Sequence, residues 1–448
     1  MTEEGGAQRS LHLRRNAEVD GTAVACPAHP DATEAEAPGG EAGDPGGSGE
    51  TLRIHSGSKV EVAVSPFKDS ATEVGKFPFY NSSMQEDTAG LRARGVLHVL
   101  WSGYIGGIER EVEAIVGYAA EHGPRRHRAC FLDGRGPIGD ALVGRGLADR
   151  LGLRHGFDAR GLRRLARYLG RTKPRFVHLQ THALTSHVVA RLALPEAIRV
   201  YTEQSPRALR HDRKFVLLYR LLRRTCSCFI ALAPAMADAM ESYGVQRDRI
   251  RVVPNAVPLP LRTSSPTDAA QSRTIGVVAR LEEQKRVDLL LEVIAELRRR
   301  GVCCAGLVVG DGTRRRQLEQ QRDALGLDDV VEFAGEQTDV VPWLDRLGLF
   351  LITSAVDPYP VAPLEAMARG IPVVAMPAKG GLEDTVGRGG VFLADRSVST
   401  AADAIAQLLS SPGLRDEVRT RGDAVVAEHR IERVFDRLEA LYSELERA

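Results

Sequence analysis

The sequence predicts an α/β protein made of two Rossmann-like halves, each with a parallel sheet, preceded by a disordered tail. From Gly95 onward, apolar strand-like runs alternate with stretches of helical periodicity. A segment rich in Pro, Ser, Thr, Asp and Gln, from Pro258 to about Arg273, interrupts this alternation, which restarts at Thr274. Strands that alternate with helices form parallel doubly wound sheets, and a chain of 448 residues buries two cores comfortably.

Residues 1–90 have a different composition, rich in Gly, Ala, Glu, Asp and Ser. Their fifteen acidic and seven basic side chains give a net charge of −8, which leaves +9 on residues 91–448. Such a segment buries too little apolar surface to offset the entropy lost on ordering. We expect a mostly disordered tail and assign it no function.

The first predicted domain spans residues 91–260. Its apolar runs predict strands at 96–101, 129–133, 176–180, 199–203, 228–232 and 250–253. Helical periodicity predicts a helix that ends near 122, and further helices at 137–150, 158–172, 184–193, 207–225 and 234–243.

The second predicted domain spans residues 261–428, with strands at 274–279, 305–310, 330–334, 349–353, 372–375 and 391–393. Helices are expected at 286–300, 313–325, 339–345, 400–409 and 413–428, and a short one before Gly370. An amphipathic closing helix, within 429–448, is expected to pack back toward the first domain. Ligands of such sheets bind at the carboxyl ends of the strands, so a cleft should lie between the two facing edges.

The sequence suggests a cytoplasmic protein. Six cysteines form no CxxC pair and no Cys/His cluster with zinc spacing, which fits a reducing compartment. No apolar run approaches the roughly 20 residues that span a bilayer, and the acidic start lacks the apolar core of a signal peptide.

Arginine accounts for most of the positive charge after residue 90, notably along 160–175 and 207–224. Well-solvated helix faces explain this composition. The alternative is attraction to an acidic acceptor or to an anionic membrane, because the basic run 207–214 is followed by Leu217, Leu218 and Tyr219. Peripheral membrane contact is therefore a separate hypothesis.

One loop near the C-terminal end carries the strongest chemical signal. Asp357 and Glu365 lie eight positions apart across a Pro-rich loop and the start of a short helix. Carboxylates bind sugar or ribose hydroxyls, while unpaired backbone N–H groups at a helix N-terminus favour phosphate. This combination on one loop suits a nucleotide sugar.

A pair of cations follows the first strand of the second half. Arg280 can form a two-pronged contact with phosphate oxygens, and Lys285 adds a point charge. In isolation such a pair is more often a solvated surface feature, but here it shares a domain with the acidic loop. The turns 310–312 and 379–381 are further candidates for ligand loops, or plain turns.

The first half offers weaker candidates. Gly106 and Gly107 stand at a strand-to-helix junction, where backbone N–H groups could meet a diphosphate, although the dinucleotide fingerprint is missing. Of three histidines in and after strand 176–180, we choose His182, because it falls past the strand end and faces the predicted cleft. Glu203, at the end of the next strand, is a candidate for contact with an acceptor.

Together these residues resemble the retaining, nucleotide-sugar-dependent glycosyltransferases of family 4, which have the GT-B fold. The matching motifs are the acid-x7-acid segment from Asp357 to Ala375, Ala279-Arg280-Leu281-x3-Lys285-Arg286, Gly310-Asp311-Gly312, Pro254-Asn255-Ala256-Val257 and Gly106-Gly107-Ile108-Glu109. The likeness covers residues 95–448. The departures are Asp357, where Glu is usual, Arg286 and Ala256 in place of glycines, and Ala233 in place of Ser.

The resemblance implies a role for each matched residue. Arg280 and Lys285 would hold the diphosphate, Glu365 the ribose, and Asp357 the donor sugar. The segment Tyr359, Pro360, Val361 and Ala362 would place its backbone N–H groups, which the proline lacks, beside Asp357. His182 would approach the sugar. The first domain would bind the acceptor. The activity implied is transfer of a hexose-type sugar with retained configuration to a glycolipid, a cell-surface polysaccharide or a secondary metabolite.

Three further expectations follow. No cofactor is expected, and the reaction should be metal-independent, because residues 91–448 contain no Asp-x-Asp motif. Nucleic acid is not an expected partner. Two alternative functions remain open on the same fold: a nucleotide-sugar epimerase, and a catalytically silent sugar-nucleotide-binding protein.

Overall fold

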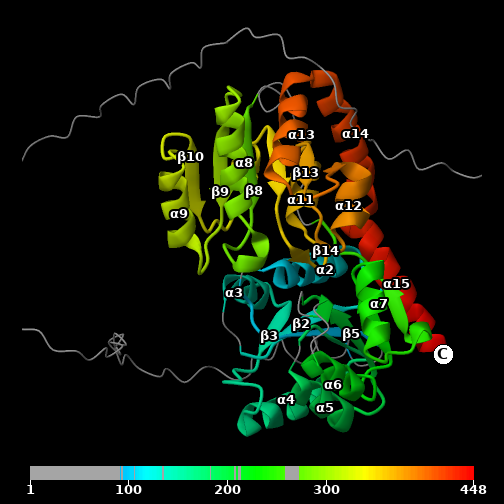
Figure 1. The fold of residues 1–448 in the computed structure, drawn as a ribbon. Helices are drawn as coiled ribbons and strands as arrows, with labels where there is room; N and C mark the ends of the chain where they lie inside the picture. Colours follow the sequence, from blue (N-terminus) through cyan, green and yellow to red (C-terminus); the bar gives the residue numbers. More distant parts are fainter. Residues whose placement is uncertain are drawn as a thin grey trace, which may run out of the picture. The chain divides into compact units, whose positions relative to one another are not determined.

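The computed structural model describes residues 91, 94–104, 106–133, 136–181, 183–205, 208–209, 213–257 and 272–448 (Figure 1). They belong to one compact unit, residues 82–448. The predicted tail and most of the predicted linker lie outside the described residues.

The first domain contains a parallel seven-stranded sheet in the order β3-β2-β1-β4-β5-β6-β7. The chain starts at β1, moves outward to β3 and returns to β4 beside β1, so the crevice of this sheet lies past the carboxyl ends of β1 and β4. The strands are β1 Val96–Leu100, β2 His127–Phe131, β3 Ala148–Arg150, β4 Phe176–Leu179, β5 Ile198–Glu203, β6 Cys228–Ala231 and β7 Ile250–Val252. The helices are α2 Gly107–His122, α3 Pro137–Gly144, α4 Ala159–Thr172, α5 Leu184–Ala193, α6 Arg213–Leu222, α7 Pro234–Ser242 and the 3₁₀ turn η2 Arg247–Arg249.

Strand β3 was not among the predicted strands. The helix predicted for 137–150 ends at Gly144, and Ala148–Arg150 then pairs with β2 at the sheet edge. Asp149 accepts from Arg128 Nε at 2.5 Å and from the Tyr168 hydroxyl at 2.5 Å. Arg128 and Tyr168 are distant from Asp149 in sequence, and their contacts override a local pattern that predicts a helix.

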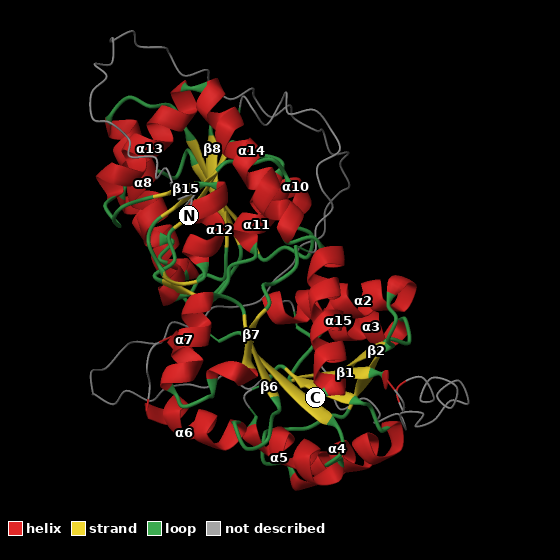
Figure 2. Ribbon diagram, turned by 90° about the vertical axis from the view of Figure 1, so that its right-hand side faces the viewer, coloured by secondary structure: helices red, strands yellow, loops and turns green. Residues whose placement is uncertain are grey.

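Alternation along the strands sorts side chains between the two faces of this sheet. Leu97 and Val99 of β1 pack into the core under α4, α5, α6 and α7, whereas Val96 packs under α2 and the C-terminal helix α15 (Ile431–Arg447). Figures 1 and 2 show α4, α5 and α6 side by side along the first sheet. The same alternation places buried His98 and His178 on the α2 and α15 face.

The second domain contains a parallel six-stranded sheet in the order β10-β9-β8-β11-β13-β15, with the corresponding crevice past β8 and β11. The strands are β8 Thr274–Val278, β9 Ala305–Val309, β10 Val331–Gly335, β11 Leu349–Ile352, β13 Val373–Ala375 and β15 Val391–Phe392, with the extra pair β12 Val356–Asp357 and β14 Lys379–Gly380. The helices are η3 Glu283–Lys285, α8 Asp288–Arg299, α9 Arg315–Ala324, α10 Val341–Leu344, α11 Ala362–Ala368, α12 Leu382–Gly389, α13 Val398–Ser410 and α14 Pro412–Glu428. The predicted pair of parallel α/β halves is confirmed.

Several helices begin where the sequence provides a capping side chain. Asp158 accepts from the N–H groups of Arg160 and Gly161, at 3.1 and 3.0 Å, at the start of α4. Ser397 and Ser411 cap α13 and α14 in the same way. These side chains satisfy backbone donors that the first helical turn leaves unpaired.

The chain passes back to the first domain after α14. Val257, at the end of the first domain, forms a bridge with Arg430, and its N–H donates to the His429 carbonyl at 2.8 Å. Helix α15 then buries Phe435 and Tyr442 in a cluster with Val96 and Phe176. The last helix thus completes the core of the first domain.

Two further observations concern the described residues. No helix among them is both long and apolar enough to cross a membrane. Cys130, Cys226, Cys228 and Cys304 are free thiols.

Candidate active site

A cavity of about 550 Å³ is lined by the carboxyl-end loops of both sheets. From the first domain come residues 106–111, together with Gln204, Asn255 and Ala256. From the second domain come residues 278–280, 284–285, 309–311 and 356–362, together with Glu365. The structure therefore brings the motifs of both halves to one cavity.

Lys285 and Asp357 form an ion pair inside this cavity. The Nζ–Oδ2 distance is 2.6 Å, and the side chains are 22% and 6% exposed. Lys285 is placed by its own carbonyl, which accepts from the Thr353 hydroxyl at 2.9 Å, and by the donation of Ala355 N to the Gln284 carbonyl at 2.8 Å. The sequence predicted both residues for the site but not their pairing.

Two glycines allow backbone segments to approach closely around the pair. Gly310 has φ +132°, and a Cβ there would lie 2.0 Å from the Ala279 carbonyl oxygen. Gly380 has φ +130°, and a Cβ there would lie 1.7 Å from the Asp357 carbonyl oxygen. Both positions combine a left-handed conformation with no room for a side chain.

Arg286 occupies a left-handed position that favours glycine, with φ +50°. Its guanidinium contacts both carboxylate oxygens of Asp288, with distances of 2.8 to 3.0 Å. This contact explains how the chain tolerates arginine where the resembling motif has glycine.

Glu365 lies in the cavity wall and is only 6% exposed. Burial raises the pKa of its carboxyl, and the charge of Arg110 partly opposes that rise. Arg110 also donates from Nη2 to the Thr338 carbonyl at 2.6 Å, so it reaches from α2 to the second domain. Glu365 is thus positioned as a largely desolvated acceptor for hydroxyl groups.

Residues 357–361 form a loop (the 357–361 loop) that leads into α11 and lines the cavity. The loop rests on the two segments that connect the domains. The Tyr359 carbonyl accepts from Asn255 Nδ2 at 3.4 Å, and the Tyr359 hydroxyl bonds His429 Nε2. The loop conformation is therefore tied to the first domain through Asn255.

Helix α2 brings its N-terminus to the other side of the cavity. It begins at Gly107, and Gly106 in extended conformation precedes it. Glu109, in the first turn, also lines the cavity, and burial raises the pKa of its carboxyl. The backbone N–H groups of this first turn are the ones that could meet an anionic ligand.

His182 lies outside the described residues, and the other two candidate histidines do not line the cavity. His178 is buried between Tyr442 and Thr202, at 2.8 and 2.6 Å, and His187 bonds the Thr181 carbonyl at 2.7 Å.

Glu203 requires a correction. It is fully buried and accepts from the Tyr201 and Tyr219 hydroxyls, at 2.9 and 2.5 Å, and from Ser205 N at 2.7 Å. It is absent from the cavity wall. This carboxylate braces the end of β5 in place of contacting an acceptor.

Sequence reasoning assigned no role to Glu111, Gln204 or Asn255, which form a polar cluster in the cavity wall. Gln204 Nε2 donates to Glu111 Oε2 at 2.7 Å, and burial raises the pKa of Glu111 to about 7. One feature of the sequence could have indicated Glu111. Glu111 lies four residues before Ile115 on the buried face of α2, where a carboxylate is unexpected.

Metal ligation has no evident site in the part of the chain that the structure describes, where no group of three or more His, Cys, Asp or Glu side chains is arranged to hold an ion.

Two family models match consecutive parts of the chain. The model described as Glycosyltransferase Family 4 matches residues 105–260, and the model described as Glycosyl transferases group 1 matches residues 265–425. The chain belongs to glycosyltransferase family 4. The match spans both halves of the cavity described above, and the resemblance drawn from the motifs is confirmed.

Two curated relatives of this family-4 chain come from bacteria. It is 30% identical to a lipopolysaccharide core biosynthesis glycosyltransferase of Rhizobium meliloti, over 44% of this chain and 58% of the relative. It is also 30% identical to an alpha-D-kanosaminyltransferase of Streptomyces kanamyceticus, over 38% of this chain and 45% of the relative. The chain thus spans about half the length of these curated relatives.

Solved structures show the same fold. Anabaena HepE in complex with UDP and glucose matches with a TM-score of 0.68 and 19% identity, over 78% of this chain and 99% of HepE. A sucrose-phosphate synthase of Thermosynechococcus elongatus matches with a TM-score of 0.62 and 17% identity, over 79% and 99%. These matches confirm the GT-B fold for the family-4 chain.

Proposed function

We propose that this protein is a retaining glycosyltransferase that moves a hexose-type sugar from a nucleoside-diphosphate sugar to a hydroxyl acceptor. The observation that carries the proposal is the convergence of Arg280, Lys285, Asp357 and Glu365 on one cavity. Cations for a diphosphate and desolvated carboxylates for hydroxyls meet there at the crevices of two Rossmann-like sheets. Acceptors in keeping with the relatives are a glycolipid, a cell-surface polysaccharide or a secondary metabolite.

The donor would bind mainly to the second domain. Arg280 and Lys285 would hold the diphosphate, and Glu365 would accept from the ribose hydroxyls. Lys285 would then divide its charge between Asp357 and the phosphate, which leaves Asp357 free to accept from the donor sugar. The N-terminus of α2 and the loop that leads into α11 add backbone N–H groups for the phosphate oxygens.

Transfer would proceed on the front face of the sugar. The bond between the anomeric carbon and the diphosphate oxygen breaks, and the acceptor oxygen forms its bond to the same face of that carbon. The departing diphosphate oxygen takes the acceptor proton. The protein contributes positioning and stabilisation of the negative leaving group, chiefly by Arg280 and Lys285.

Metal independence is part of this proposal, because two side-chain cations and the helix N-termini provide the positive field that a divalent ion would otherwise supply. Turnover should be unchanged by a chelator. Activity that is lost with the chelator and restored by added divalent metal would contradict it.

The test is a screen of the purified protein against nucleoside-diphosphate sugars that differ in base and sugar, with release of free nucleotide as the readout. Release from one donor identifies that donor, and Glu365→Ala should abolish it. An epimerase would convert the sugar without releasing nucleotide. A silent binding protein would bind one nucleotide and turn over none, which would refute the proposal.

Peripheral contact with an anionic membrane is a second part of the proposal. Phe157, Leu192 and Leu217 are 82%, 75% and 62% exposed on or beside α4, α5 and α6. Helices α4 and α6 also carry exposed arginines, among them Arg160, Arg163, Arg167 and Arg220. The basic side chains of the run 207–214 lie outside the described part of the structure, so α4 to α6 carry the argument. Exposed apolar side chains within a basic surface suit an anionic bilayer.

Flotation tests this contact. The wild type should float with vesicles that contain anionic lipid at low salt and remain at the bottom with zwitterionic vesicles. Phe157→Ser combined with Leu192→Ser should reduce flotation, whereas Leu325→Ser, which removes an exposed leucine from the second domain, should not. Equal flotation by all three proteins, or none at low salt, would rule the contact out.

A further inference from the structure

Glu111 presents a carboxyl group to the cavity between two side-chain amides. Gln204 Nε2 donates to its Oε2 at 2.7 Å. The amide of Asn255 lies on the other side, with its nearer polar atom 3.1 Å from each carboxyl oxygen. Glu111 is 7% exposed and Asn255 is 3% exposed, so neither group can exchange this partner readily for water.

Gln204 belongs to a chain of hydrogen bonds that leads away from Glu111, and the donor of each bond in this chain can be assigned. Gln204 Nε2 also donates to Gln180 Oε1 at 3.1 Å, and Gln180 Nε2 lies 3.4 Å from His98 Nδ1. An amide nitrogen only donates, so His98 accepts at Nδ1 and carries its proton on Nε2. Its Nε2 then donates to His127 Nδ1 at 3.0 Å.

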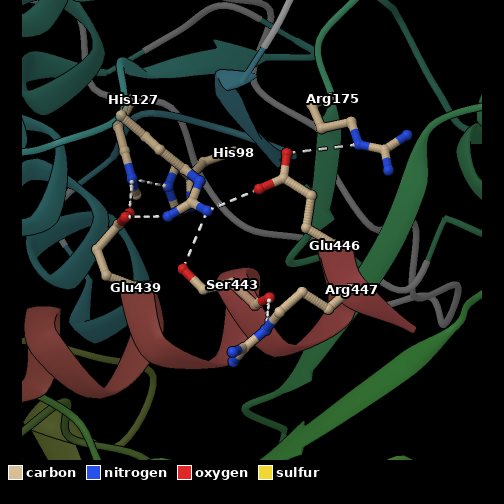
Figure 3. A network of polar contacts seen from close by, with 8 residues as sticks. His98, His127, Arg175, Glu439, Ser443, Glu446 and Arg447 are labelled. Atoms are coloured by element: carbon tan, nitrogen blue, oxygen red, sulfur yellow. Dashed lines mark hydrogen bonds and ion pairs between the residues drawn. The ribbon is translucent and has the colours of Figure 1, made fainter.

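The chain ends on α15, where His127 Nε2 donates to Glu439 Oε1 at 2.8 Å, as Figure 3 shows. Burial lowers the pKa of both His98 and His127, which keeps the two rings neutral and each with one proton. Gln204 therefore cannot turn over without breaking this chain. Its donation to Glu111 holds in either protonation state of the carboxyl.

The Asn255 amide has no such constraint, because it has two satisfactory orientations. When Glu111 is protonated, its hydroxyl donates to the Asn255 oxygen, and Asn255 Nδ2 donates to the Tyr359 carbonyl at 3.4 Å. When Glu111 is ionised, two acceptors would face one another. Turning the amide over then brings its nitrogen to Glu111 at 3.1 Å, and the Tyr359 carbonyl loses the donor Nδ2.

We propose that Glu111 is a positioning residue for the 357–361 loop, acting through Asn255: the protonated acid lets Asn255 hold the Tyr359 carbonyl, and the ionised acid withdraws that amide. The proposal rests on the proposed function only in taking this loop as part of the nucleotide site. A residue of the first domain would thus control a loop of the second domain.

The change falls in a reachable pH range, because burial raises the pKa of Glu111 to about 7. The surrounding titratable and charged groups are Tyr442 on α15, His98 and His178 on the strands below, Glu109 and Arg110 on α2, and Lys285, Asp357 and Glu365 across the cavity. Tyr442 stays neutral, since burial raises its pKa well above the usual value. The protonated, loop-holding state is thus expected below neutral pH and is lost as the pH rises.

Hydrogen exchange without ligand tests the mechanism directly. Peptides that cover the 357–361 loop are compared between the wild type and Glu111→Gln at about pH 6 and about pH 8, either side of the pKa of about 7. A glutamine amide at 111 donates to the Asn255 oxygen at every pH. We expect equal protection at the lower pH and roughly two- to tenfold more protection in Glu111→Gln at the higher pH, the change that one hydrogen bond supports.

Affinity for UDP, used as the probe nucleotide, gives the functional readout. The two proteins should bind UDP equally at the lower pH, and Glu111→Gln should bind it roughly two- to tenfold more tightly at the higher pH. Glu113→Gln is the matched control on the same helix, since Glu113 is not in the cavity wall. It should follow the wild type in both measurements.

The two measurements separate the inference from the proposed function. Altered exchange with no nucleotide binding would support the role of Glu111 and count against the proposed function. Identical pH profiles of exchange in the wild type and Glu111→Gln would overturn the inference, whatever UDP does. So would a Glu113→Gln variant that behaves like Glu111→Gln.

Discussion

Replacing Glu439 should detach the C-terminal helix from the first domain more than any surface change on that helix. Glu439 accepts from His127 Nε2 at 2.8 Å (Figure 3). It also accepts from Arg125 Nη1 at 2.5 Å, and its side chain is 9% exposed. In Glu439→Ala the buried His127 loses its acceptor and Arg125 loses its more buried partner. Arg125 keeps Glu446 at 2.9 Å, which is 26% exposed.

The expected magnitude follows from this partial compensation. Removing one partner of a buried ion pair typically costs about 3–5 kcal/mol. Because Glu446 remains, we expect the lower end, about 3 kcal/mol, which corresponds to roughly a 150-fold change in an equilibrium constant. The pKa of Glu439 is lowered by His127 and Arg125 against the effect of burial. The wild-type advantage is therefore present above the ordinary carboxyl pKa and is lost as the pH falls through the folded value.

Amide hydrogen exchange of α15 measures this effect without assuming that two domains unfold together. Peptides from residues 434–445 should lose roughly 150-fold in protection in Glu439→Ala. The matched control is Glu444→Ala on the same helix, whose pair with Arg251 is 51% and 36% exposed. A surface pair contributes at most about 1 kcal/mol, so its loss should lower protection by at most about fivefold.

Equal losses in the two variants would refute the reasoning, because burial would then have no bearing on what the ion pair contributes. An unchanged exchange rate in both would show that apolar packing alone holds α15.

Three further outcomes are expected. Gly380→Ala should abolish UDP binding measured by calorimetry, because a Cβ would strike the Asp357 carbonyl at 1.7 Å, while Gly413→Ala, with open space around it, should bind normally. Lys285→Met should reduce nucleotide release by about 100- to 1,000-fold, since it removes a cation aimed at the leaving group, and turnover within tenfold of wild type would contradict that role. UDP affinity should fall as the pH drops through the raised pKa of Glu365, because only its carboxylate accepts from two hydroxyls, and Glu365→Gln should bind weakly with no such pH dependence.

The second domain was predictable in most of its parts because its information is local. Each of β8, β9, β11 and β13 is a contiguous apolar run, which marks a strand buried on both faces. The cations at 280 and 285 and the acids at 357 and 365 each lie within one short segment after a strand. Once parallel sheets are expected, the position of those segments at the carboxyl edge follows.

Features that depend on distant partners were missed. Strand β3 forms because Asp149 meets Arg128 and Tyr168, and no pattern within residues 148–150 announces this. Strands β12 and β14 are two residues each and exist through their mutual pairing, with Asp357 beside Gly380. Short segments of this kind carry too little periodicity to be recognised.

For a related reason, the sequence did not indicate which acidic side chains of the first domain face the cavity. Glu203 ends a strand at the correct edge, yet two tyrosine hydroxyls and a backbone N–H enclose it. Glu111 lies on the buried face of a helix and nevertheless reaches the cavity, because α2 turns that face toward Gln204 and Asn255. Which carboxylate is enclosed and which is presented to a ligand depends on neighbours that only tertiary structure supplies.

These neighbours also connect the cavity to the end of the chain. The hydrogen bonds that start at Glu111 end at Glu439 on α15, and the segment that leads into α15 carries His429, which bonds the Tyr359 hydroxyl. Tyr359 is therefore held at its carbonyl by Asn255 and at its hydroxyl by His429. Both contacts come from segments that connect the domains, so a change in how α15 docks on the first domain would reach the 357–361 loop from two sides. It follows that Glu439→Ala, more than 70 residues away in sequence, should weaken UDP binding as well as α15, whereas Glu444→Ala should leave UDP binding unchanged.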